Sequence, residues 1–356
     1  MYTSFTARNF RCFEYLTVEP LERVNLIAGK NNIGKTAFLE ALWLHHGYHN
    51  PTLGPKVDGF RGLEHFVKDE FLWDLFQNFD HERTIELSSQ DSAHQSRSLR
   101  IEISEHPMSR ISAPSRGREL PATEAISQET TEPVGSEISL DYTDTTGRSV
   151  QSRIIVEEEE IEFERARGVK EPSAIFLAAR RPGDQKRLAE RFGNLEIKRE
   201  QGRIIELLQI IEPRLEDLAV LYRAGAPMTY GDIGMEQLVP LPLMGDGMGR
   251  LLRIALAIPE VQDGVLLVDE VENGLHYTVM RKIWEAIANL AREYNVQVFA
   301  TTHSEECIRA AHQAFSTDEQ YDFALHRLER VKGAIRAVTY DKETLGAALE
   351  AGLEVR

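Results

Sequence analysis

Two parts of the chain combine short apolar runs with segments whose apolar residues recur every three or four positions. The runs begin at residues 24, 174, 265 and 297, and each is about five residues long. Such runs predict buried strands, and the segments between the later ones read as helices. Strands that alternate with helices are typical of an α/β fold with a parallel sheet. We therefore expect residues 1–47 and 170–310 to form one core.

From residue 83 to 165 the pattern changes to alternation of apolar and polar residues. Candidate strands cover 84–87, 99–103, 138–142 and 152–156, and a turn signal lies at 143–148. Alternation of this kind predicts an antiparallel sheet with one face toward solvent. We expect an antiparallel β-subdomain inserted into the α/β fold. Its segment 105–137 is rich in Ser, Pro, Thr and Glu, which predicts a flexible loop.

The remaining segments predict smaller additions to the core. Two strands joined by a tight turn are expected between residues 5 and 18. An apolar stripe near Ile204 and Leu208 predicts a helical lobe over 186–240. Residues 311–356 should contain a hairpin that turns at 331–333 and a last helix that begins near Lys342. Together the segments predict one α/β head over 1–356, with a mixed sheet, the β-subdomain and the helical lobe.

A glycine-rich loop follows the first core strand directly. Residues 29–36 read Gly-Lys-Asn-Asn-Ile-Gly-Lys-Thr, which is the G-x-x-x-x-G-K-T phosphate-binding pattern, or P-loop. Glycines let backbone N–H groups turn toward a phosphate, and the following helix adds the partial positive charge of its N-terminus. Lys35 is expected to reach the β- and γ-phosphates of ATP, and the Thr36 hydroxyl to bind Mg²⁺. The expected nucleotide contacts are Gly29, Lys30, Asn31, Asn32, Ile33, Gly34, Lys35, Thr36 and Ala37.

Two carboxylates end the apolar run that begins at residue 265. In P-loop enzymes an aspartate at this place holds Mg²⁺, directly or through water. We therefore assign Asp269 to the metal and Glu270 to the activation of the attacking water. An acidic pair that merely ends a strand is the alternative interpretation. The next apolar run ends in Thr-His-Ser, and His303 is expected to contact the γ-phosphate or the water, with a simple polar cap as the alternative.

Two weaker signals lie elsewhere in the chain. Gly245-Asp246-Gly247 opens a helical segment and is either a second anion site or an ordinary turn and cap. Arg11 lies on a segment expected beside the P-loop, where it either contacts phosphate or is a solvated arginine at a strand end.

Composition narrows the class of protein. The 356 residues are 42% hydrophobic and 28% charged, and the formal net charge is −16. This acidity argues against strong non-specific binding of DNA, although a local basic groove stays possible. The sequence has no apolar run long enough for a membrane helix. Its first residues lack the apolar core of a secretory signal. The two cysteines, Cys12 and Cys307, lie far apart in the chain. We therefore expect a cytoplasmic protein that does not enter a membrane.

These stretches together resemble the ABC-type ATPase heads of the SMC/RecF class, and most of all the OLD-like ATPases of bacterial anti-phage systems. Asn9-Phe10-Arg11 resembles the entry strand of that class, and residues 245–250 stand at the signature motif. Asp269-Glu270 matches Walker B, residues 272–276 occupy the D-loop, and His303 matches the switch histidine. The usual Ser-Gly-Gly of the signature is replaced near Asp246-Gly247, and Gln185 is only a guess for the Q-loop glutamine.

The resemblance implies a mechanism and several kinds of partner. In this class ATP closes a dimer of heads, because the signature motif of one head completes the P-loop site of the other. The first hypothesis is a Mg²⁺-dependent ATPase that forms a homo-oligomer and controls a separate effector, such as a nuclease or toxin. The second is a RecF-like ATPase that binds DNA in recombination or repair. The third is a scaffold that binds nucleotide and assembles with little turnover.

Overall fold

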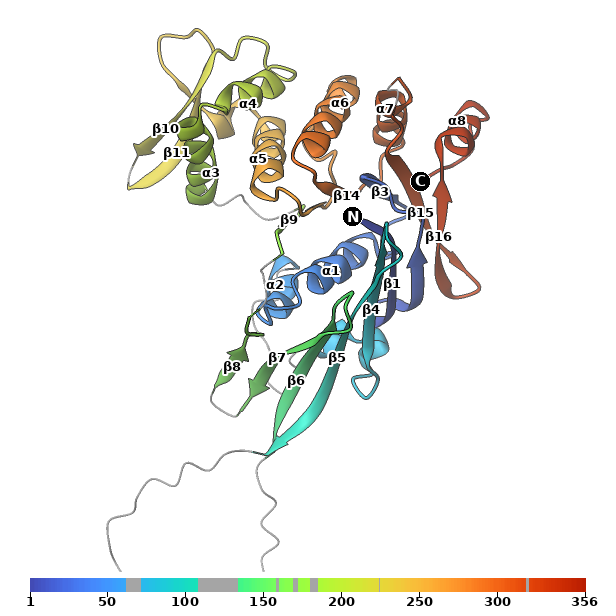
Figure 1. The fold of residues 1–356 in the computed structure, drawn as a ribbon. Helices are drawn as coiled ribbons and strands as arrows, with labels where there is room; N and C mark the ends of the chain where they lie inside the picture. The colour runs from blue at the N-terminus through green and yellow to red at the C-terminus, as the bar shows by residue number, and fades with distance from the viewer. Residues whose placement is uncertain are drawn as a thin grey trace, which may run out of the picture.

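The computed structural model describes residues 1–61, 72–107, 134–157, 160–168, 172–179, 185–223, 225–317 and 320–356. Two sheets dominate this part of the chain, with helices between them and on the far side of one of them (Figure 1). The arrangement confirms the expected α/β fold. Within the described residues, no helix has both the length and the apolar character that crossing a bilayer requires.

The core sheet has six strands in the order β16-β15-β3-β14-β13-β9. Five of these strands are parallel and β16 runs antiparallel to β15. The strands are β3 (Val24–Ala28), β9 (Ala174–Leu177), β13 (Val265–Val268), β14 (Gln297–Thr301), β15 (Phe323–Val331) and β16 (Ala334–Tyr340). Every residue of β3, β13 and β14 is buried, the polar Asn25 and Gln297 included, as mainly apolar runs predict for a sheet covered on both faces.

Helices cover both faces of this sheet. The helices α5 (Asp246–Glu260), α6 (Tyr277–Glu293), α7 (Glu305–Ser316) and α8 (Lys342–Glu350) lie on one side (Figure 1). On the other side α1 (Lys35–His46) and α2 (Leu53–Phe60) lie between the core sheet and the second sheet. Alternate residues of β3 pack into two different hydrophobic clusters: Leu26 joins the cluster of α5 to α7, and Ile27 joins that of α1.

The second sheet corrects the expected domain division. It has seven antiparallel strands in the order β2-β1-β4-β5-β6-β7-β8, so the N-terminal hairpin and the inserted strands form one sheet. The hairpin leaves one edge of β1 open, and β4 pairs with it from Tyr2 opposite Asp91 to Arg8 opposite Glu86. Its strands are β1 (Tyr2–Phe10), β2 (Phe13–Val18), β4 (Ile85–Asp91), β5 (Ser96–Pro107), β6 (Val134–Thr143), β7 (Ser149–Val156) and β8 (Ile161–Glu164). Most of the predicted loop 105–137 lies outside the described residues, and β5 and β6 extend into both of its ends.

The lobe after β9 is only half helical, which corrects the prediction for 186–240. It begins with α3 (Gln185–Lys198) and α4 (Gln201–Leu208), and α4 ends before Pro213. A small antiparallel sheet of β10 (Asp217–Arg223), β11 (Ala226–Asp232) and β12 (Val239–Pro240) follows, with the 3-10 turn η4 (Leu241–Met244). Gly225, at φ +82°, stands at the turn between β10 and β11, where only glycine adopts such a φ freely.

The remaining predictions for the ends of the chain are confirmed. Residues 323–340 form the β15–β16 hairpin, and α8 begins at Lys342 with a capping box made by Asp341. Two short 3-10 turns, η2 (Trp73–Leu75) and η3 (Gln77–Phe79), precede β4.

Candidate nucleotide site

The phosphate loop connects β3 to the first residue of α1, Lys35. Two of its glycines have positive φ angles, +144° at Gly29 and +102° at Gly34. A Cβ atom at Gly29 would lie 2.7 Å from the carbonyl oxygen of Leu328, and one at Gly34 would lie 2.6 Å from Sγ of Cys12. Both positions therefore require glycine for space as well as for backbone conformation. The loop is thus held between β15 and the turn of the N-terminal hairpin.

Lys35 closes the loop with its own side chain. Its Nζ donates hydrogen bonds to the carbonyl oxygens of Gly29, at 2.8 Å, and Lys30, at 3.1 Å. Burial lowers the pKa of Lys35, while Asp269, Glu270 and Glu272 raise it. The ammonium group therefore lies against the loop backbone, in the electrostatic field of the carboxylates that follow β13. An anion bound in the loop would meet this charge directly.

Thr36 and Asp269 come together across the core sheet. Oγ1 of Thr36 donates to Oδ1 of Asp269 at 3.0 Å, and Oγ1 of Thr301 donates to the same oxygen at 2.7 Å. Asp269 is buried, with 7% of its surface exposed. A hydroxyl and a carboxylate are oxygen ligands of the kind that Mg²⁺ prefers, so this pair fits the metal assigned to it from the sequence. Thr301, at the end of β14, received no role from the sequence.

Glu270 adopts a strained backbone conformation directly after Asp269. Its φ is +50°, in the left-handed region that side-chain-bearing residues rarely occupy. The backbone N–H of Glu270 donates to Oγ1 of Thr301 at 2.7 Å, and its Oε2 accepts a hydrogen bond from Nδ2 of Asn273 at 2.7 Å. A strained backbone conformation that neighbouring contacts stabilise is typical of functional positions. The Asn273 amide, which sequence reasoning placed only in the D-loop, orients the carboxylate of the expected base.

His303 is paired with a carboxylate of the D-loop. Both its backbone N–H and its Nδ1 lie close to Oε1 of Glu272, at 2.9 and 3.1 Å. The cap of α7 is made by Ser304, whose Oγ accepts from the N–H of Cys307. His303 itself therefore does not cap α7, and its expected contact with the γ-phosphate or the water stays a prediction. Its side chain is 50% exposed, so the imidazole remains accessible while Glu272 holds one of its nitrogens.

Arg250 belongs to the stretch placed at the signature motif from the sequence, but it received no role of its own there. It is 2% exposed, and its guanidinium donates to the carbonyl oxygen of Asp269, to that of Glu270 at 3.3 Å and to that of Ala178 at 3.4 Å. Burial lowers its pKa to about 10, and the nearby Arg253 adds to the effect. Arg250 therefore stays charged at neutral pH and ties α5 to the ends of β13 and β9. In the sequence, Arg250 stands out because it is a positively charged residue within an apolar helical segment.

The glycine turn at the start of α5 packs on the D-loop. Asp246 is exposed in the first turn of α5, and Gly247 is buried beneath it. A Cβ atom at Gly247 would lie 2.4 Å from the carbonyl oxygen of Gly274, so the two backbones touch. The structure thus joins the turn at 245–247 to residues 272–276 within one chain.

The structure places Arg11 in a cluster of carboxylates. Its guanidinium is paired with Asp58 at 2.7 Å, Glu40 at 3.4 Å and Asp74, and its side chain is 9% exposed. The alternative of a solvated strand-end arginine is therefore wrong. The expected phosphate contact would require these ion pairs to break. The proposed Q-loop residue, Gln185, is the first residue of α3.

Comparison with known proteins relates this site to a family. The model of the AAA_21 family, described as "AAA domain, putative AbiEii toxin, Type IV TA system", matches residues 24–309. An "ATP/GTP phosphatase" of Helicobacter pylori is 37% identical over 93 residues, which make up 25% of this chain and 24% of that protein. The chain therefore aligns with about a quarter of the length of that relative. An uncharacterised protein of Methanocaldococcus jannaschii, MJECL11, is 30% identical over 115 residues, or 32% of this chain and 90% of its own length.

A solved structure of an Smc head, bound to the C-winged helix domain of ScpA, shares the fold. The TM-score is 0.52 over 98% of this chain and 99% of that chain, at 12% sequence identity. At this identity the likeness concerns the fold alone. It agrees with the SMC-like head expected from the sequence motifs.

Proposed function

Because the chain belongs to the AAA_21 family, we propose that it is a Mg²⁺-dependent ATPase that converts ATP to ADP and phosphate. The observation that carries this proposal is the 3.0 Å contact between Thr36 and Asp269. It puts the two expected metal ligands side by side at the end of the loop that Lys35 closes. The "ATP/GTP phosphatase" name of the relative from Helicobacter pylori supports the same reaction class.

Each group of the site has a role in this reaction. The backbone of residues 29–36 and the Lys35 ammonium bind the phosphates, which Lys35 reaches by leaving the carbonyl oxygens of Gly29 and Lys30. Thr36 and Asp269 would hold Mg²⁺, which would supply positive charge beside the phosphate oxygens. Glu270, oriented by Asn273, takes a proton from the attacking water. His303 donates to the γ-phosphate while Glu272 holds its Nδ1.

The proposal extends to assembly and control. ATP bound to one head would meet the exposed first turn of α5 from a second head, whose helix N-terminus favours anions. Asp246 must turn away from the γ-phosphate in this arrangement, since like charges repel. The assembled heads would then control a separate effector in the cytoplasm, such as a nuclease or toxin in anti-phage defence. The family description, which names a toxin–antitoxin system, supports an effector of this kind.

The test is phosphate release and solution mass of Glu270→Gln, with Lys35→Ala and the parent chain as controls. We expect Glu270→Gln to bind ATP, to lose turnover by roughly two to three orders of magnitude, and to shift from monomer to a larger species with Mg-ATP. Lys35→Ala should lose nucleotide binding. Hydrolysis by Glu270→Gln at the parent rate would show that another group is the base. A mass that is large and independent of ATP would favour a standing scaffold instead.

A further inference from the structure

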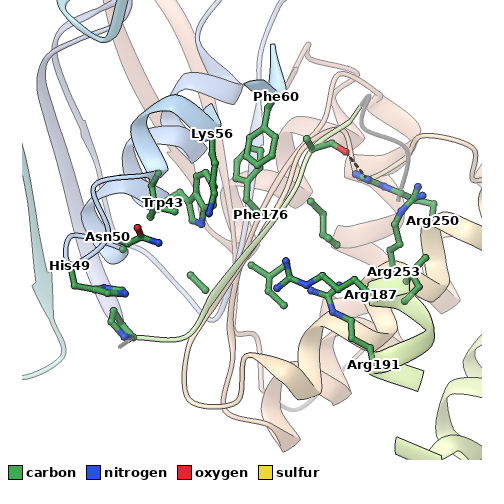
Figure 2. Close-up of a pocket in the computed structure, with 18 residues that line it drawn as sticks. Trp43, His49, Asn50, Lys56, Phe60, Phe176, Arg187, Arg191, Arg250 and Arg253 are labelled. Carbon is green, nitrogen blue, oxygen red and sulfur yellow. Dashed lines mark hydrogen bonds between the residues drawn. The ribbon is translucent and has the colours of Figure 1, made fainter. Parts of the chain in front are cut away.

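The edge of the core sheet at β9 opens into a cavity of about 590 Å³. β9 is the last strand of the sheet among the described strands, and its residues line the cavity along the whole strand. Figure 2 shows the strand passing between two groups of side chains. Aromatic residues and Lys56 from α1 and α2 lie on one side, and arginines from α3 and α5 lie on the other.

The backbone of β9 leaves pairing groups directed into this cavity. The carbonyl oxygens of Ser173 and Leu177 accept from Val265 and Asp269, both at 3.0 Å. Alternate residues of a parallel strand point their N–H and C=O groups to opposite edges. Ala174 and Phe176 therefore direct these groups away from β13. Such an edge is a template for one further strand.

The two faces of the edge differ in chemistry. On the side of α1 and α2, the ring of Phe176 stacks on Phe60 with centroids 5.1 Å apart and lies 5.6 Å from Trp43. These three rings form an apolar surface on one face of the sheet. A strand added beside β9 would place every second side chain over this surface and the others on the opposite face.

The opposite face is cationic. Arg187 and Arg191 of α3 and Arg253 of α5 line it, and the described lining residues as a whole include no carboxylate. Glu260, at the end of α5, pairs with Arg187 at 3.3 Å and also with Arg191. A concentration of positive charge in a chain of net charge −16 favours an acidic ligand.

We propose that β9 binds an extended segment of a partner protein, in which acidic residues alternate with apolar ones, as a seventh strand of the core sheet. Its apolar side chains lie over Trp43, Phe60 and Phe176. Its carboxylates face the arginines and compete with Glu260 for Arg187 and Arg191. Main-chain hydrogen bonds to Ala174 and Phe176 supply the pairing that is common in strand addition.

The position of this edge connects it to the nucleotide site. Arg250 lines the cavity and donates to the carbonyl oxygens of Ala178, just beyond β9, and of Asp269. A strand bound at β9 would therefore lie beside the group that holds the backbone of Asp269 and Glu270. Binding itself does not depend on the proposed hydrolysis, because β9 contributes no residue to the phosphate loop.

The experiment uses the full chain carrying Lys35→Ala, so that the outcome is independent of nucleotide. A fluorescein-labelled peptide of four Val-Glu repeats is titrated with this protein, and anisotropy reports binding. We expect saturable binding that weakens with added salt. Arg253→Gln should weaken binding roughly tenfold, through the loss of a charged contact. Glu260→Gln should strengthen it, because one competing carboxylate is gone. Arg281→Gln on α6, outside the cavity, should leave it unchanged.

Modified peptides separate strand pairing from simple charge attraction. Of two peptides methylated on alternate amide nitrogens, one should bind and the other should not, since only one set of amides faces β9. A peptide with four Val followed by four Glu should bind at least tenfold more weakly. Equal binding of the alternating and block peptides, equal binding of both methylated peptides, or absence of saturable binding would each overturn the proposal. Thermal unfolding of every variant confirms that the protein remains folded.

Discussion

Oγ1 of Thr36 lies 3.0 Å from Oδ1 of Asp269, although 233 residues separate the two in the chain. The strands that precede them, β3 and β13, are not neighbours, because β14 lies between the two. Thr36 reaches across from the start of α1, and Thr301 of β14 contacts the same carboxylate. The parallel order of the sheet thus gathers three oxygen-bearing side chains at the carboxyl ends of its central strands.

Removal of the Thr36 hydroxyl should lower the apparent affinity for Mg²⁺ in ATP hydrolysis. We expect Thr36→Ala to raise the Mg²⁺ concentration for half-maximal phosphate release at least tenfold, because one oxygen ligand is lost. Thr36→Ser keeps the hydroxyl and should stay close to the parent chain. Phosphate release measured across a Mg²⁺ titration checks this. If the alanine and serine variants show the same Mg²⁺ dependence, Thr36 does not bind the metal.

Asn273 should act through the orientation of Glu270. We expect Asn273→Ala to lower kcat roughly tenfold with little change in KM, because the 2.7 Å hydrogen bond to Oε2 is lost. Asn273→Asp places a second negative charge beside Glu270, which favours protonation of the base. The acid limb of the pH–rate profile should therefore move to higher pH. Asn289→Ala, at an exposed position of α6, is the matched control. An unchanged pH profile in Asn273→Asp would argue against this role.

The contact between α5 and the D-loop should be sensitive to one methyl group. At Gly247 an added Cβ atom would lie 2.4 Å from the carbonyl oxygen of Gly274, whereas the same atom at Gly249 meets open space. We expect Gly247→Ala to destabilise the fold by about 1–3 kcal/mol. Gly249→Ala should be neutral or stabilise it by up to about 1 kcal/mol, as alanine does in a helix. Thermal unfolding compares the two, and equal shifts in Tm would contradict the close approach.

Stability should fall in mild acid because of buried histidines. Burial lowers the pKa of His326 to about 3 from an ordinary value of 6.5. Its neutral form therefore contributes stability that is complete above about pH 6.5 and is lost as the pH falls toward 3. The loss should reach about 2 kcal/mol at pH 5.

The measurement is thermal unfolding between pH 7 and pH 5. We expect His326→Gln to lose less of its stability over this interval than the parent chain does. His94→Asn, at an exposed position, should keep the pH dependence of the parent. An equal fall in Tm for His326→Gln and the parent would assign the acid sensitivity to other groups, such as the buried His45 and the partly buried His46.

Local sequence was enough to predict most of the helices and strands and to single out candidate chemical groups at the ends of the core strands. The phosphate loop, the acidic pair after β13 and the histidine after β14 each occupy a few consecutive residues. Each is recognised because an apolar run is followed directly by glycines or by polar residues. Strands β4 to β7 of the insert were found for the same reason, because alternation is a property of neighbouring residues, whereas β8 was not predicted. The strands of the lobe, β10 to β12, were missed because the whole of 186–240 was assigned to a helical lobe on the basis of the apolar stripe near Ile204 and Leu208.

Other features depended on contacts between distant segments. Three such contacts join groups that lie far apart in the chain. Strand β4 pairs with β1, and Arg11 forms ion pairs with Asp58 and Glu40. Arg250 donates to the carbonyl oxygens of Asp269 and Glu270. No periodicity within one segment encodes them.

The sequence by itself therefore determined most strands and helices of the two large sheets and their cover, and which residues are expected to carry phosphate and metal chemistry. Only the tertiary structure decided which edges pair, which charges neutralise one another, and that β9 borders a cationic cavity. The physical reason is that many segments of similar local sequence could form the hydrogen bonds of a strand edge or the ion pair of a buried charge. The packing of the whole core selects among them.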